Sequence, residues 1–186
     1  LACAHGAGSL VLLGDPQQLD QPQQGSHPQG THVSALQHLL GDGQTLRAGA
    51  GLFLGETYRL HPELCDFTSK LFYEDRLDPV PGLERQVLSG PVVRGAGLWH
   101  LPVEHEGNQS VSVEEVTPVA TLGRGLADGT TLWTGRDGAT RPLDLDGILI
   151  VAPYNLQVEA LEDALPAGAR VGTVDTAMVA GQAQRE

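Results

Sequence analysis

The chain has 186 residues and a formal net charge of −12, with 23 Asp and Glu against 11 Lys and Arg. Its hydrophobic content of 40% and mean hydropathy of −0.12 are typical of a globular protein, and no apolar run approaches the ~20 residues of a membrane-spanning helix. Taken alone, the acidic balance argues against a nucleic-acid binder, because affinity for phosphates comes mainly from basic side chains, and we expect at most weak nucleic-acid binding by this chain.

The first predicted element is a short buried strand, residues 10–13, whose apolar run stops at Gly14-Asp15-Pro16. Gly and Pro end a strand, so Asp15 lies where a carboxylate can face a ligand at the strand's carboxyl end. Gln17 and Gln18 follow at once, and each amide offers both a donor and an acceptor. The pattern indicates a nucleotide site, with an ordinary strand-to-turn junction as the alternative.

Three further elements are expected before residue 73. A short helix carries apolar residues at helical spacing, namely Val33, Leu36, Leu39 and Leu40. Gly41-Asp42-Gly43 stops this helix, and a short strand is expected at residues 52–54. A second helix begins at Pro62, where the missing N–H costs nothing. Its apolar residues share one face, namely Leu64, Phe67, Leu71 and Phe72.

The second half of the chain is expected to alternate between strands and helices. Residues 77–97 are loop-like, and residues 133–146 are charged and rich in turn formers. The expected elements are a strand at 98–103, a helix at 113–126 that contains Pro118, a strand at 148–151, a helix at 154–165 and a strand at 170–174. The final strand, helix and strand predict a parallel pair.

Four short motifs follow one another along the chain: GDPQQL at 14–19, TYRLHP at 57–62, VAPYNLQ at 151–157 and VGTVD at 171–175. In this order they resemble motif III, the Tyr-Arg-x-His-Pro motif, the Pro-Tyr-x-x-Gln motif and the start of motif V in the Upf-like branch of superfamily 1 helicases. Residues 102–108 (PVEHEGN) add a likeness to bacterial proteins that fuse a RecB-like nuclease to an Upf-like helicase.

The resemblance implies an α/β fold, an incomplete RecA-like parallel sheet of the P-loop NTPase type with flanking helices. Residues 1–43 would be the end of the first RecA-like domain, and residues 44–186 most of the second, truncated in motif V. The implied function is that of a fragment of an ATP-dependent nucleic-acid helicase, whose second motor domain contributes to ATP hydrolysis and strand translocation.

The same resemblance implies cofactors and partners. They are ATP and Mg²⁺, bound mainly by motifs upstream of this chain, and single-stranded nucleic acid, with DNA favoured over RNA. The remaining helicase domain and an N-terminal nuclease domain would belong to the same parent chain, in the cytoplasm and without a membrane partner.

Several parts of such a helicase have no counterpart here. The sequence contains no Gly-x-x-x-x-Gly-Lys-Ser/Thr loop (Walker A), no Asp-Glu pair before residue 14 (Walker B) and no arginine-bearing motif VI. After Asp175 the resemblance is lost. We therefore expect the interior of a longer helicase that is inactive alone. The alternative is a catalytically inactive RecA-like binding or scaffold module, and a Gly-Lys-Thr loop encoded upstream in the same frame would favour the motor.

Arg59 is the predicted catalytic residue. By resemblance its guanidinium contacts the phosphates of ATP, although an ion pair with Glu56 or Glu63 is the structural alternative. Gln18 resembles the glutamine that senses the γ-phosphate, and Asp15 would hold a water or a neighbouring side chain at the Mg²⁺ site. A solvated amide and a capping carboxylate are the respective alternatives.

Five residues are implied nucleic-acid contacts: Pro153, Tyr154, Gln157, Thr173 and Asp175. Tyr154 would stack on a base, and a tyrosine that anchors the helix to the sheet is the alternative. Thr173 and Asp175 would touch the nucleic-acid backbone and bridge to the nucleotide, as the start of motif V does in the family.

The remaining titratable residues predict no metal site. The seven histidines lack ligand spacing; His61 is expected to hydrogen-bond within the fold, and His100 and His105 to be solvated. Cys3 and Cys65 are expected as free thiols, with a disulfide as the alternative. The sequence also contains an acidic run made of Glu104, Glu106, Glu114 and Glu115. We expect it to be a solvated face rather than a nuclease metal site, because such sites need carboxylates that converge from separate elements.

Overall fold

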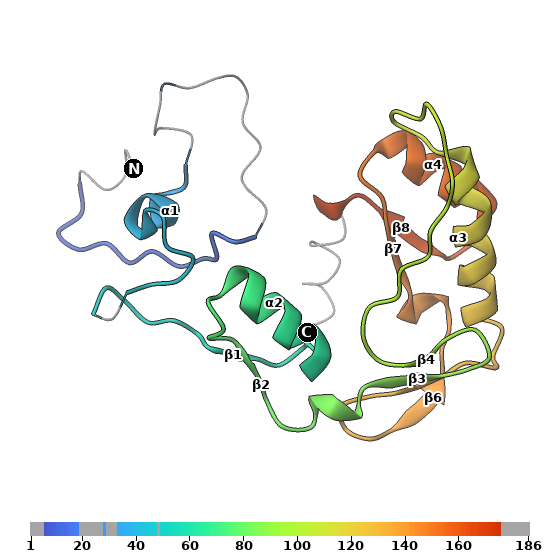
Figure 1. The fold of residues 1–186 in the computed structure, drawn as a ribbon, viewed down its shortest axis with the longest axis horizontal. Coiled ribbons are helices and arrows are strands. Elements are labelled where there is room, and N and C mark those ends of the chain that lie inside the picture. The colour runs from blue at the N-terminus through green and yellow to red at the C-terminus, as the bar shows by residue number, and fades with distance from the viewer. Residues whose placement is uncertain (1–5, 19–27, 29–32, 48, 176–186) are drawn as a thin grey trace. The chain divides into compact units, whose positions relative to one another are not determined.

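The computed structural model describes residues 6–18, 28, 33–47 and 49–175, which divide into one unit within Leu1–Val80 and another within Pro81–Glu186 (Figure 1). Both units contain parallel strands and helices, so the predicted α/β class is confirmed. The predicted domain boundary near residue 43 stays a prediction, because packing units need not coincide with RecA-like domains. The predictions for Cys3, Leu19 and residues 176–186 lie outside the described residues.

The first unit is built around the helix α2, Pro62–Phe72, which connects two parallel strands, β1 (Glu56–Thr57) and β2 (Asp78–Pro79). Before them lies α1, Ala35–Leu40. Both predicted helices are therefore confirmed. The predicted stop of α1 is confirmed as well, because Gly41 adopts φ 59°, a conformation that suits glycine.

Two strands predicted in this unit are wrong. Residues 10–13 form no strand, and Val11 and Leu13 are 78% and 90% exposed. A buried parallel strand needs hydrogen-bonded neighbours, and within the described part of the chain no strand pairs with this run. Residues 52–54 form no strand either. The ladder begins only at β1, because the parallel register places residues 52–54 opposite residues 74–76, where Glu74 and Asp75 adopt positive φ angles that no strand has.

The second unit contains the predicted strand–helix–strand. β7 (Leu149–Val151) and β8 (Arg170–Gly172) pair in parallel, and α4 (Asn155–Ala164) connects them. α3 (Val113–Leu126) has the predicted bounds and continues through Pro118. Their core consists of Ala120, Ala152, Leu161 and Leu165, with partly buried side chains of both helices and both strands around it.

An antiparallel sheet in the second unit was not predicted. Its strand order is β4-β3-β5-β6. The strands are β3 (Val87–Ser89), β4 (Arg94–Gly95), β5 (Leu132–Thr134) and β6 (Thr140–Pro142), with 3₁₀ helices at Leu83–Arg85 and Leu145–Gly147. β5 and β6 form a hairpin that turns through Gly138 at φ 81°. The segments expected to be loop-like or turn-rich therefore hold paired strands.

The strand predicted at residues 98–103 is also wrong, since this segment is extended without a ladder. Pro102 removes one of the donors that a ladder needs, and Leu98 and Leu101 are 71% and 57% exposed. None of the described helices has the length and apolar character needed to cross a membrane.

Candidate functional site

The carboxylate of Asp15 is the centre of a hydrogen-bond cluster in the first unit. Its Oδ1 accepts from the backbone N–H of Gln17 at 3.0 Å. Its Oδ2 accepts from Gln18 Nε2 at 2.8 Å and from Tyr73 Oη at 2.6 Å. The bond to Gln17 is the local turn geometry of a capping aspartate, whereas the bond to Tyr73 connects residues 58 positions apart. Asp15 therefore orients Gln18 and is itself tied to α2.

A second set of bonds holds the same loop against the end of α2. Gln17 Nε2 donates to the carbonyl of Gln44 at 3.3 Å, and Gln44 Nε2 donates to the carbonyl of Leu71 at 2.9 Å. The carboxylate of Glu74 accepts from Thr45 Oγ1 at 2.6 Å and from the N–H of Gln44 at 3.1 Å. These bonds lower the pKa of Glu74, so they add stability at neutral pH that is lost as the pH falls and Glu74 is protonated.

The ring of Tyr73 is supported by Phe53, whose ring centroid lies 6.2 Å away. The guanidinium of Arg76 lies 4.7 Å from the centroid of Phe53 and donates to Thr45 Oγ1 at 2.5 Å and to the carbonyl of Leu46 at 2.9 Å. Sequence reasoning missed this support. No local pattern marks contacts between positions this far apart in the chain.

Two consecutive residues after α2 adopt the left-handed conformation, Glu74 at φ 54° and Asp75 at φ 59°. This conformation costs an L-residue about 1–2 kcal/mol, whereas glycine adopts it at little cost. Asp75→Gly should therefore raise the free energy of unfolding by roughly 0.5–1 kcal/mol, or about 2 °C in Tm.

Thermal unfolding followed by circular dichroism measures this change. The comparison variant is Asp66→Gly, which places glycine inside α2 and should lower the free energy of unfolding by roughly 0.5 kcal/mol, because aspartate is itself a poor helix former and the exposed ion pair with Lys70 contributes little. A loss of stability in Asp75→Gly would show that the aspartate side chain outweighs the conformational gain.

Arg59 lies between β1 and α2 and is exposed. Its backbone N–H donates to Thr57 Oγ1 at 3.3 Å, and His61 Nδ1 accepts from the N–H of Glu63 at 3.2 Å as the N-cap of α2. The predicted hydrogen-bonding role of His61 is thus confirmed. Arg59 and the Asp15 cluster lie at opposite ends of α2, whose 11 residues span about 16 Å. The catalytic role of Arg59 stays a prediction.

Four of the five predicted nucleic-acid contacts share one edge of the β7–β8 pair. Pro153 and Tyr154 follow β7, and Thr173 and Asp175 follow β8; because the strands are parallel, both segments leave at the carboxyl end. The N–H of Ala152 donates to the carbonyl of Gly172 at 3.0 Å, which keeps the two segments side by side. Tyr154 is 52% exposed, so its ring is accessible for stacking.

The fifth residue, Gln157, has a different place. It is 5% exposed, and both polar atoms of its amide bind the backbone of Ser112, the N-cap of α3. Oε1 accepts from the N–H of Ser112 at 2.7 Å, and Nε2 donates to its carbonyl at 3.2 Å. In this structure Gln157 ties the start of α3 to the start of α4. A direct contact with nucleic acid would require both bonds to break.

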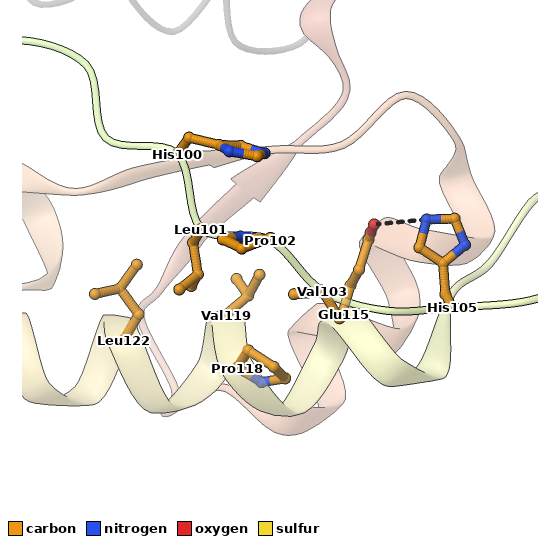
Figure 2. A pocket seen from close by; sticks show the side chains of 9 residues that line it. All are labelled: His100, Leu101, Pro102, Val103, His105, Glu115, Pro118, Val119 and Leu122. Carbon is orange, nitrogen blue, oxygen red and sulfur yellow. Dashed lines mark ion pairs between the residues drawn. The ribbon is translucent and has the colours of Figure 1, made fainter.

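Beyond Ser112, a groove of about 450 Å³ lies between α3 and the extended segment before it (Figure 2). Figure 2 shows His105 facing Glu115 at its rim, with Nε2 and Oε1 4.0 Å apart. Both side chains are nearly half exposed, so the pair is screened and contributes little. The described residues contain no group of three or more His, Cys, Asp or Glu that could hold a metal ion.

The AAA domain family matches residues 32–180 of this chain. Among curated proteins, the 3'-5' exoribonuclease HELZ2 of Homo sapiens is 30% identical over 175 residues, which cover 86% of this chain and 5% of that protein. The chain thus spans a small part of this relative's length. No solved structure shows a significant match.

Proposed function

Because the chain belongs to the AAA domain family, we propose that it is part of an ATP-dependent nucleic-acid helicase of superfamily 1. The observation that carries the proposal is the parallel pair β7–β8, which brings residues 151–157 and 171–175 to one sheet edge. The family match and the curated relative support a superfamily 1 helicase core. The likeness to RecB-like nuclease fusions is the narrower part of the proposal.

In the proposed mechanism, this chain supplies Gln18 and Arg59 to ATP bound between two RecA-like domains. Gln18 is exposed and gives one amide N–H to Asp15, so its second N–H is a donor for the γ-phosphate. The guanidinium of Arg59 stabilises negative charge that develops on that phosphate. Gln18 and Arg59 lie at opposite ends of α2, so the triphosphate and the extended arginine side chain together would span the distance between them. Closure of the two domains would couple ATP hydrolysis to movement along the nucleic-acid strand.

Mg²⁺ would accompany ATP, but the described residues do not fit it. They hold no cluster of metal-ligating side chains, and both carboxylate oxygens of Asp15 are engaged by protein donors. In this proposal the ion is held by other segments of a longer chain.

Single-stranded nucleic acid would bind along the β7–β8 edge. The ring of Tyr154 stacks on a base, and the hydroxyl of Thr173 donates to the phosphate backbone. The chain's net charge of −12 means that such a contact is local rather than spread over a basic surface. The sequence resemblance favours DNA, and RNA is tested beside it because the curated relative is named an exoribonuclease.

A second candidate is a catalytically inactive RecA-like module that binds or scaffolds. The observation that favours it is the lack of any Gly-x-x-x-x-Gly-Lys-Ser/Thr loop in the 186 residues. Such a loop wraps the phosphates of ATP, and the described loops offer no replacement for its lysine.

The two candidates differ in ATP turnover by the full-length protein. We expect the full-length protein to hydrolyse ATP faster when a single-stranded oligonucleotide is present, and the 186-residue chain alone to show no turnover above buffer, because it lacks a phosphate cradle. Phosphate release with and without poly-dT or poly-U measures both. Absent turnover in the full-length protein would favour the scaffold, and turnover by the chain alone would contradict the fragment assignment.

A further inference from the structure

We propose that Tyr73 is a positioning residue for the nucleotide site, because its hydroxyl holds Asp15 and, through Asp15, the amide of Gln18. The inference rests on the proposed function, in which Gln18 contacts the γ-phosphate of ATP. None of the four motifs includes Tyr73, which is the C-cap of α2.

The hydrogen bonds at Asp15 explain how Tyr73 can orient the amide of Gln18. Its Oη and Gln18 Nε2 both donate to the same oxygen, Asp15 Oδ2, at 2.6 and 2.8 Å. A carboxylate is acceptor-only, so the amide of Gln18 must present its nitrogen to Asp15 and cannot turn over without repulsion. The second N–H of this nitrogen then points in a fixed direction, and it can donate to a phosphate oxygen.

Tyr73 can hold this arrangement because it is itself held. Its backbone N–H donates to the carbonyl of Ser69 at 2.9 Å, and its ring lies against Phe53. Burial and the bond to Asp15 raise the pKa of Tyr73, so the hydroxyl remains a donor at neutral pH. The oxygen Oδ2 therefore faces a rigid, permanently protonated partner.

The bond also spans the domain boundary predicted near residue 43. Asp15 and Gln18 precede the boundary, and Tyr73 follows it. In the structure all three residues lie in the unit Leu1–Val80, so the hydroxyl of Tyr73 holds Asp15 and Gln18 within one packing unit.

Tyr73→Phe tests the inference in the full-length protein, because phenylalanine keeps the ring and removes only the hydroxyl. We expect kcat for ATP to fall about ten- to a hundredfold, as misplacement of a contact group does, with KM within about twofold. In an Asp15→Ala background the same change should cause no further loss, because the hydroxyl acts through Asp15. The matched control is Thr68→Val, which removes a hydroxyl from the same helix whose bond, to the carbonyl of Leu64, is local.

Hydrogen exchange supplies a readout that needs no activity. Tyr73→Phe should speed exchange of the N–H groups of Gln17 and Gln18, which bond to Asp15, and Thr68→Val should not. An unchanged kcat in Tyr73→Phe, with or without a lower Tm, would overturn the inference, as would unchanged exchange. A wild-type protein without ATPase activity would instead refute the proposed function, and exchange would still decide whether Tyr73 holds the loop.

Discussion

Arg59→Ala should lower kcat for ATP in the full-length protein on the order of a thousandfold, with a much smaller change in ATP binding in the ground state. Arginines that stabilise charge on a transferring phosphoryl group have effects of this size. The guanidinium acts on charge that develops in the transition state, so its loss is expected in kcat rather than in KM. Steady-state ATPase kinetics in the presence of a single-stranded oligonucleotide measure both constants.

Arg59→Lys tests whether a positive charge alone can replace the guanidinium. An ammonium cannot reproduce the two-pronged contact of a guanidinium with a phosphate, so lysine should recover little activity. Both variants should keep the wild-type Tm to within about a degree, because Arg59 is exposed and surface substitutions cost little. Full activity together with a large drop in Tm would make Arg59 a structural residue, as its alternative pairing with Glu56 or Glu63 would require.

The elements that the sequence predicted correctly carry their own local signals. α2 has Pro62 at its first position, and α3 and α4 present apolar residues at helical spacing. β7 is an unbroken run of branched side chains, and its pairing with β8 follows from the connecting helix. Each of these signals lies within the element or immediately beside it.

The failures depend on partners far away in the chain. Residues 10–13, 52–54 and 98–103 have strand-like composition, but among the described residues no neighbour completes a ladder with them. Conversely, β3 becomes a strand because β5, more than 40 residues later, pairs with it. The Asp137-Gly138 dipeptide in the β5–β6 hairpin is a local turn signal that agrees with the observed strands.

The candidate sites follow the same division. Motif resemblance identified Asp15, Gln18 and Arg59, and it located four exposed or half-buried residues at the β7–β8 edge. It could not identify Tyr73, because the partner of its hydroxyl is 58 positions away. It also could not distinguish Gln157 as a buried side chain from Tyr154 as an accessible one, since both belong to one motif.

Gln157→Leu should reduce the free energy of unfolding by about 2–4 kcal/mol, because the N–H and the carbonyl of Ser112 would both lose their partner in a buried place. For a chain of this length the change corresponds to a Tm lower by roughly 10 °C. Thermal unfolding followed by circular dichroism measures it. Gln37→Leu is the matched control, since Gln37 is only partly buried and its side-chain bond to the Gly41 carbonyl lies at the surface; it should cost under about 1 kcal/mol.

Gln157→Glu separates hydrogen bonding from packing. At neutral pH a carboxylate can still accept from the N–H of Ser112 but faces the Ser112 carbonyl with a second oxygen, so stability should fall as in Gln157→Leu. The folded state then favours the protonated acid, which raises the pKa of this glutamate above its unfolded value. Stability should therefore return as the pH is lowered, because the protonated carboxyl donates to the Ser112 carbonyl.

The outcome also decides what the Pro-Tyr-x-x-Gln resemblance means in this chain. If Gln157 ties α3 to α4, then Gln157→Leu loses stability, and nucleic-acid binding weakens only to the extent that the β7–β8 edge is disturbed. If Gln157 instead contacts the nucleic-acid strand directly, Gln157→Leu weakens nucleic-acid binding while Tm stays at the wild-type value. The buried amide, with both atoms bonded to one backbone residue, favours the first outcome, and it leaves Tyr154 as the motif residue that we propose to contact nucleic acid.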